Sequence, residues 1–384
     1  MLEEYMQNIG YSKEQIDMIE ASYPLRSYTE STLLYCLKNL VNYLRRNTFD
    51  NNDIIYITTV LPQLISMSIE DIKIKVDELL NHGISKINVY HIIKEYPYII
   101  DMSNQRISNK YQILDELGFS NQAINSIIIN QPSILNIDPS FLKNRYLFFK
   151  DYGYKQNEIH TIIEAIPELF LITTNKLQKK LDEYSSFGLK KDEIIKLTYY
   201  LPELFIFVKE ELREKTFFME EYGYPIEDII SIIKRVPIIL KSSYISQLQT
   251  KWNVLEGLGF TSSEVVQITK ENPYILLYCS DFIKENFDNF VQNNFYHKEV
   301  LEMILKTPLL LSYSKETMSH KLKYYKKFLL FDYIKENPHV LLYNIDIIKK
   351  REKYIKDKEY VDLFLNDSLF KKKYKVSREK LLGE

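Results

Sequence analysis

Prolines recur along this chain at a nearly constant interval, and a glycine precedes most of them at a fixed distance. Eight prolines follow one another at steps of 35 residues, with one step of 36: Pro62, Pro97, Pro132, Pro167, Pro202, Pro237, Pro273 and Pro308. Seven glycines each stand 14 residues before a proline: Gly10, Gly83, Gly118, Gly153, Gly188, Gly223 and Gly259. Asn294 holds the next position due, and Asn is the other residue that tolerates a left-handed backbone. This period predicts an array of one repeated unit.

The unit from Pro97 to Pro132 predicts two helices. Ser103 and Ser120 are typical N-cap residues, Gly118 ends the first helix, and Pro132 stops the second. Apolar residues fall between these signals at helical steps of three and four: Ile107, Tyr111, Leu114 and Leu117, then Ile124, Ile127 and Ile128. The only tryptophan, Trp252, falls on the same apolar stripe in its own unit and is therefore predicted to be a core residue.

Two such helices cannot bury both apolar stripes alone, whereas stacked units can. We therefore predict an all-α fold, an α-solenoid of about nine to ten repeats that forms a curved superhelix. Residues 1–45 are expected to form an N-terminal capping repeat, residues 46–345 the array, and residues 346–384 a C-terminal cap with a Lys-rich tail. The first unit carries an expected insertion around residues 47–52, and the last loses a piece near Phe331.

Composition excludes several classes of protein. Cys36 and Cys279 lack metal-ligand spacing, which favours a reducing compartment. No apolar run approaches the roughly 18 residues of a membrane span, and the N-terminal segment resembles neither a secretory signal nor an Arg-rich presequence. These patterns predict a cytoplasmic monomer without membrane contact, unless a presequence has been removed. The six histidines are scattered, and phosphate-binding, zinc and nucleophile motifs are missing, so we expect no metal, no cofactor and no enzymatic activity.

Three strings carry a resemblance to a known family: "LDELGFSNQAINSIIINQPSIL", "FFMEEYGYPIEDIISIIKRVPIIL" and "WNVLEGLGFTSSEVVQITKENPYIL". With the ending "DSLFKKKYKV", they resemble the mitochondrial transcription termination factor (mTERF) family over most of the chain. The resemblance implies a left-handed superhelix of three-helix units, with a short 3₁₀ piece after each proline. It also implies binding of double-stranded DNA, or of structured RNA, along a basic concave groove.

One polar position repeats as strictly as the core does. Counted from the turn glycine or from the preceding proline, it holds a cation in eight of nine repeats: Lys75, Lys110, Arg145, Lys180, Lys215, Lys251, Lys321 and Arg351. Asn286 is the exception. We call these eight residues the cation series. It flanks the buried stripe, so two interpretations stay open: a row of phosphate contacts, or side chains tied to carbonyls at the preceding proline turn.

The predicted function is binding of duplex nucleic acid by the cation series, in transcription, replication or element maintenance. The net charge of −2 is unusual for such a protein taken whole, but the two faces of a solenoid can differ in sign. Arg106, Arg145, Arg213 and Arg235 are weaker candidates for reading guanine edges, and the lysines near position 372 for contacting phosphates. The alternative is a protein-interaction solenoid whose groove holds an acidic helix or a partner's tail.

Overall fold

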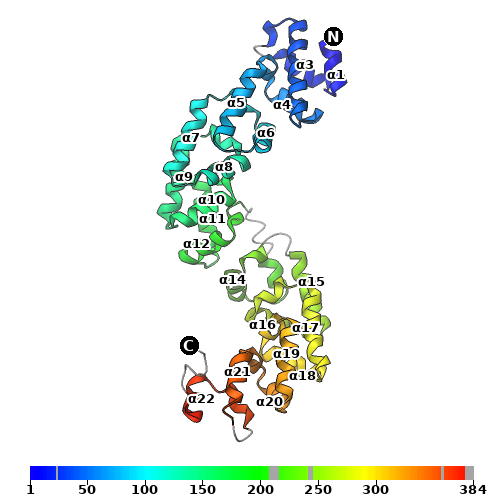
Figure 1. Ribbon diagram of the computed structural model, residues 1–384, viewed down its shortest axis with the longest axis vertical. Coiled ribbons are helices and arrows are strands. Elements are labelled where there is room, and N and C mark those ends of the chain that lie inside the picture. The colour runs from blue at the N-terminus through cyan, green and yellow to red at the C-terminus, as the bar shows by residue number, and fades with distance from the viewer. Residues whose placement is uncertain (23–24, 207–215, 241–244, 356–358, 377–384) are drawn as a thin grey trace. The chain divides into compact units, whose positions relative to one another are not determined.

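The computed structural model describes residues 1–22, 25–206, 216–240, 245–355 and 359–376 (Figure 1). These residues form α-helices and short 3₁₀ helices and contain no strand, which confirms the predicted all-α solenoid. The chain divides into two compact units, one formed by Met1–Tyr184 with Ile194–Phe205 and the other by Ser185–Glu193 with Ile206–Glu384.

The first compact unit holds α1 to α12. Their bounds are α1 Leu2–Ile9, α2 Lys13–Ala21, α3 Glu30–Arg46, α4 Asn51–Val60, α5 Ile69–Asn81, α6 Lys86–Glu95, α7 Asn104–Glu116, α8 Asn121–Asn130, α9 Pro139–Tyr152, α10 Gln156–Ala165, α11 Thr174–Ser186 and α12 Lys191–Tyr200. The 3₁₀ helices are η1 Leu25–Ser27, η2 Pro62–Ser66, η3 Pro97–Asp101, η4 Pro132–Asn136, η5 Pro167–Phe170 and η6 Pro202–Phe205. The end of α11 and the start of α12, within Ser185–Glu193, belong to the second compact unit, which resumes at Ile206.

The second compact unit continues the same order. Its helices are α14 Ile226–Arg235, α15 Ile245–Gly257, α16 Ser262–Glu271, α17 Ser280–Gln292, α18 His297–Lys306, α19 Lys315–Lys326, α20 Phe331–Glu336, α21 Ile345–Glu352 and α22 Asp367–Tyr374. Its 3₁₀ helices are η7 Pro237–Leu240, η9 Pro273–Leu277, η10 Pro308–Ser312, η11 Pro338–Leu342 and η12 Tyr360–Phe364.

The turn signals act as the sequence predicts. Ser103 and Ser120 accept hydrogen bonds from the backbone N–H groups of Arg106 and Ala123, and each proline of the 35-residue series opens a 3₁₀ helix. The seven turn glycines have positive φ, and so does Asn294 at 72°. Two further units lack a glycine, and there Thr48 (φ 72°) and Leu329 (φ 55°) adopt the left-handed conformation instead.

The two ends depart from the period in ways that the sequence located only roughly. The extra length of the first unit lies in α3, which has 17 residues where α5 has 13, and not only in residues 47–52. Near Phe331, α20 has six residues where α18 has ten. The repeat continues after Asp346, where η12 and α22 follow α21 without a proline.

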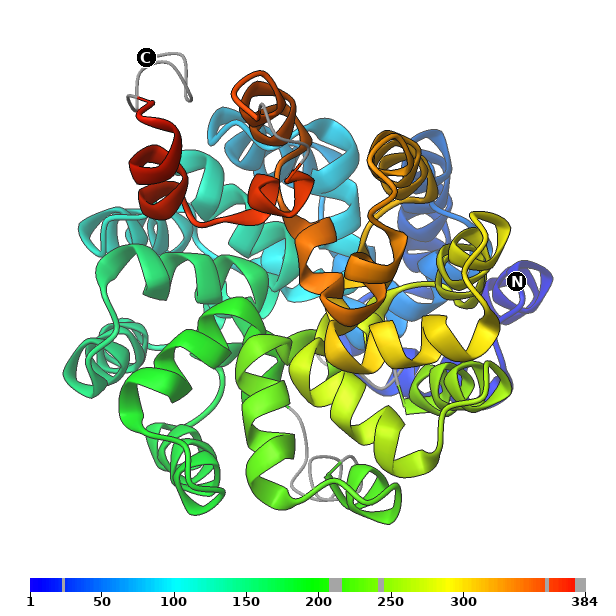
Figure 2. The ribbon, with the colours of Figure 1, turned by 90° about the horizontal axis from the view of Figure 1, so that it is seen from below.

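Helices of the same kind stack on one another. First helices pack on first helices, as α7 on α9 and α17 on α19, and second helices pack on second helices, as α6 on α8 and α16 on α18. Several 3₁₀ helices also lie against the first helix that precedes them in the chain, as η4 does against α7 and η10 against α17. Figure 2 shows that, within each compact unit, successive helix pairs turn about the stacking direction.

Buried tyrosine and threonine side chains join some repeats. The residue after the turn is tyrosine in three repeats, and its hydroxyl bonds to a threonine of the next second helix: Tyr11 to Thr58 at 2.6 Å, Tyr154 to Thr198 at 2.7 Å and Tyr224 to Thr269 at 2.6 Å. In the other described repeats the same two positions hold an apolar residue and an isoleucine, all buried: Phe49 and Ile93, Ile84 and Ile128, Phe119 and Ile163, Leu189 and Ile233, Phe260 and Ile304, Phe295 and Ile334. Tyrosine is thus always matched by threonine and an apolar residue by isoleucine.

Candidate nucleic-acid interface

The cation series lies on the first helices, beside the buried stripe. The described members are Lys75 on α5, Lys110 on α7, Arg145 on α9, Lys180 on α11, Lys251 on α15, Lys321 on α19 and Arg351 on α21. Lys215 lies outside the described residues. Burial is deep for several of them, because Lys110 and Arg351 are 2% exposed and Lys321 is 5% exposed. Lys110, Lys251, Lys321 and Arg351 are therefore buried in the stack, whereas Lys75, Arg145 and Lys180 are half-buried.

Backbone carbonyls hold the charged ends of these side chains. Lys110 donates to the carbonyl of Ile137, Arg145 Nε to that of Ile172 at 2.9 Å, and Lys321 Nζ to that of Leu341 at 2.6 Å. Each carbonyl lies at the end of the 3₁₀ helix that follows the cation in the chain. Carbonyls of the preceding proline turn were predicted from the sequence, and that part of the prediction is wrong. The reason is that 3₁₀ helices such as η4 and η5 pack against the first helix that precedes them in the chain, α7 and α9.

Arg351 makes the most extensive set of these bonds. Its guanidinium donates to the carbonyls of Leu363, at 2.8 Å, and Leu365, and it pairs with the carboxylate of Asp367. It therefore ties α21 to η12 and to the start of α22, which explains why the fold persists beyond Asp346 without the proline signal.

Asn286 keeps the same bond without a charge. Its amide nitrogen donates to the carbonyl of Leu311 at 3.0 Å, at the end of η10. The side chain is 3% exposed. What this position supplies in every such case is a hydrogen-bond donor for a buried carbonyl.

The remaining members are also engaged or enclosed. Lys75 bonds to the side-chain oxygen of Asn104, and Lys180 pairs with Glu183 at 3.0 Å with both side chains 10% exposed. Lys251 is buried. Burial lowers the pKa of Lys75, of Lys110 and of Lys321 below the usual lysine value, because their charged forms are partly removed from water. Contact between the cation series and nucleic acid stays a prediction.

The candidate base-reading arginines also have partners in the fold. Arg106 donates to Asn136, and Arg235 donates to the carbonyls of Lys270 and Glu271 at 2.9 Å each. The guanidinium of Arg145 lies 5.1 Å from the centre of the Phe141 ring. Arg213 lies outside the described residues.

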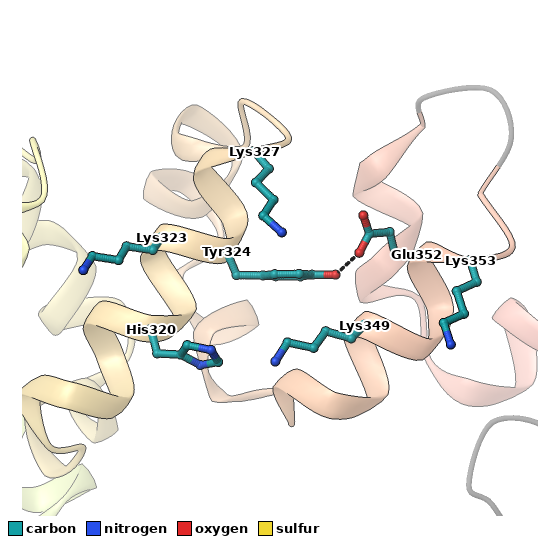
Figure 3. A pocket seen from close by; sticks show the side chains of 7 residues that line it. All are labelled: His320, Lys323, Tyr324, Lys327, Lys349, Glu352 and Lys353. Carbon is teal, nitrogen blue, oxygen red and sulfur yellow. Dashed lines mark hydrogen bonds between the residues drawn. The ribbon is translucent and has the colours of Figure 1, made fainter.

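A second cluster of cations lies between α19 and α21. A hollow of about 760 Å³ is lined by His320, Lys323, Tyr324, Lys327, Lys349, Glu352 and Lys353, which we call the basic pocket (Figure 3). Tyr324 reaches across it from α19 and donates its hydroxyl to Glu352 on α21. Lys327 and Lys349 lie on either side of the Tyr324 ring, with Nζ 4.8 Å and 5.9 Å from its centre.

Burial, followed by the bond to Glu352, raises the pKa of Tyr324, so its hydroxyl remains a donor at neutral pH. This pocket was not predicted from the sequence. Its signal is a pair of lysines four residues apart on each of two successive first helices, Lys323 with Lys327 and Lys349 with Lys353. That spacing puts each pair on one helix face.

The described residues supply no cluster of His, Cys, Asp and Glu able to hold a metal ion. Within the same residues, no helix has the length and apolar character needed to cross a membrane. Cys36 and Cys279 are free thiols.

A model of the mTERF family matches residues 3–205, 101–232 and 209–375, which together span most of the chain. The chain belongs to the mTERF family. This family consists of non-enzymatic proteins that bind nucleic acid, so this mTERF protein is a nucleic-acid-binding helical repeat protein. The 3₁₀ helix at each proline of the 35-residue series agrees with the unit that the family resemblance implies. A search of curated proteins finds no significant match.

Proposed function

We propose that this mTERF protein binds duplex nucleic acid, DNA or structured RNA, through its phosphate backbone, and acts in transcription, replication or element maintenance. Membership of a nucleic-acid-binding family carries the proposal. The distribution of charge supports it: the segment from Lys315 to Lys353 holds ten basic and five acidic residues, a local net charge of +5 in a chain of net charge −2. Such a segment attracts phosphates whatever the base sequence.

The cation series has a different primary role in this proposal. A buried lysine whose Nζ already donates to a carbonyl must lose that bond, and the stacking that surrounds it, before it can reach a phosphate. The exposed lysines have no such cost. Phosphate contact therefore comes mainly from exposed cations, while the cation series fixes one repeat to the next.

A protein partner with an acidic helix is the alternative, since the same lysines attract carboxylates. Salt dependence separates the two. Duplex nucleic acid releases condensed counterions when phosphates are neutralised, so log K falls linearly with log salt at a slope near −0.9 for each phosphate contacted. An acidic peptide lacks that dense counterion layer and gives a shallower slope.

The test is an anisotropy titration of the full-length protein against a fluorescent duplex of about 30 base pairs, from about 50 to 300 mM KCl. We expect a linear dependence with a slope of about −3 or steeper. Poly-glutamate of equal total charge serves as the competitor. No binding at the lowest salt, or poly-glutamate that binds more tightly than the duplex, would contradict the proposal.

A further inference from the structure

The basic pocket gathers four lysines, Lys323, Lys327, Lys349 and Lys353, around a single carboxylate, that of Glu352. Lysines that join neighbouring second helices lie on carboxylates, as Lys234 does on Glu193 at 2.8 Å and Lys335 on Glu299 at 2.9 Å. Within the described residues, no carboxylate forms an ion pair with Lys323, Lys327, Lys349 or Lys353. Four lysines thus line one hollow that holds a single carboxylate, and Lys327 and Lys349 are the two that lie beside the Tyr324 ring (Figure 3).

The single acid of the pocket, Glu352, has a hydrogen-bond partner of its own. Glu352 accepts the hydroxyl of Tyr324, which binds one lobe of the carboxylate and disperses its charge. The Tyr324 side chain is 6% exposed and is wedged between α19 and α21, so this arrangement is built into the packing of the two helices (Figure 3). Tyr324 therefore holds one oxygen of Glu352, whose negative charge remains in the pocket but is not paired directly with Lys327 or Lys349.

We propose that the basic pocket is the seat of successive phosphates of one nucleic-acid strand, with Glu352 limiting the affinity and Tyr324 restraining Glu352. This inference rests on the proposed function and names the residues that perform it. The pocket is wide enough for more than one phosphate, and its lysines come from two consecutive repeats. Lysine contacts a phosphate as a point charge, so the site favours backbone contact over base recognition.

The first arm of the test removes cations. Lys327→Gln/Lys349→Gln in the full-length protein should weaken binding to the duplex about tenfold at low salt and make the salt slope shallower by about two. The control is Lys13→Gln/Lys298→Gln, which removes two exposed charges from the second helices α2 and α18 and should change neither quantity. Melting of each variant establishes that the helices remain folded.

In the second arm, substitutions of Glu352 and of Tyr324 should change duplex affinity in opposite directions. Glu352→Gln retains an acceptor for Tyr324 and removes the negative charge, so affinity should rise about threefold. Tyr324→Phe frees Glu352 to pair with the lysines, so affinity should fall, and the double variant Tyr324→Phe/Glu352→Gln should recover it. If Glu352 had only a structural role, Glu352→Gln would not raise the affinity for the duplex.

The outcomes separate this inference from the function on which it rests. Failure of the wild-type protein to bind the duplex overturns the proposed function. Duplex binding by wild type that is unchanged in Lys327→Gln/Lys349→Gln overturns the pocket alone. Tripolyphosphate provides the remaining arm: if the pocket variants lose tripolyphosphate binding but bind the duplex as wild type does, the pocket is a site for a small polyphosphate and the inference is wrong.

Discussion

Asn286 shows what the position of the cation series on each first helix requires of a side chain. An amide there reaches the carbonyl of Leu311 as well as the ammonium of Lys321 reaches that of Leu341, although only the lysine is charged. Reach and a donor are therefore sufficient. A charge is tolerated because the long aliphatic stem fills space along the core while the end is bonded. The strict recurrence of lysine and arginine in the sequence reflects length as much as charge.

Lys321 gives a direct test of this requirement. Lys321→Met retains the stem but leaves the buried Leu341 carbonyl without its donor, whereas Lys321→Gln retains a neutral donor. We expect the methionine variant to be less stable than the glutamine variant by about 1–3 kcal/mol in urea unfolding. Equal stabilities would show that the bond to Leu341 contributes nothing.

The same reasoning predicts the binding behaviour of the cation series. Lys110→Gln/Arg145→Gln removes two charges and keeps two donors, so duplex affinity per folded molecule should remain at the wild-type value. The measurement is the titration used for the wild-type protein, with melting as the control for folding. A loss of affinity of about tenfold or more, as expected for two phosphate contacts, would show that Lys110 and Arg145 do contact the duplex.

Between helices, the matching of Tyr154 with Thr198 fixes the pairing of two repeats. Thr198 also donates to the carbonyl of Ile194 at 2.8 Å, so its oxygen is left as the acceptor for the tyrosine hydroxyl. Both side chains are buried, and burial raises the pKa of Tyr154. A tyrosine at this position without its threonine would bury an unpaired hydroxyl.

Thr198→Val creates that situation. We expect a loss of about 1–3 kcal/mol in the free energy of unfolding, because the Tyr154 hydroxyl remains buried without a partner. The double variant Tyr154→Phe/Thr198→Ile adopts the apolar pairing found in other repeats and should regain most of the loss. If the double variant is as unstable as the single one, the cost arises from packing volume and not from the hydroxyl.

The sequence predicts helices, caps and 3₁₀ turns well because each depends on local signals such as Ser103 or Pro132. It does not predict which repeat accepts the Lys110 ammonium, since that depends on η4 folding back against α7. Local signals do not predict the basic pocket either, because Lys327 and Lys349 are brought together only when α19 stacks against α21. The tyrosine and threonine matching is present in the sequence but becomes visible only when each repeat is aligned with the next.

For the whole molecule, the buried tyrosines predict a limit at alkaline pH. Burial raises the pKa of Tyr11 and of Tyr224 to about 12, against about 10 in the unfolded chain. Between these values the unfolded chain holds fewer protons than the folded one, so the free energy of unfolding should fall as pH rises from about 10 to 12. Urea unfolding across this range checks the sign, and replacing both pairs by phenylalanine and isoleucine should reduce the slope. Stability that rises with pH would contradict the assignment.

Removal of a whole repeat gives a test at the same scale. Deleting residues 155–189 would put Tyr154 in the place of Leu189, so that it packs against Ile233 with its hydroxyl unpaired. Deleting residues 120–154 would instead place Phe119 opposite Thr198, which still bonds to its own helix. We expect the first deletion to be less stable by about 1–3 kcal/mol, and Tyr154→Phe to correct it. Equal melting of the two deletion proteins would refute this.

Repeat arrays gain and lose units when recombination joins one copy to another. In this chain the outcome depends on where the junction falls, because a tyrosine unit requires a threonine unit after it while an apolar unit accepts either neighbour. Three tyrosine units, those of Tyr11, Tyr154 and Tyr224, therefore restrict the places where a copy can be lost. The length of the surface offered to a ligand can therefore change most readily by gain or loss of apolar units, in the stretches between the three tyrosine units.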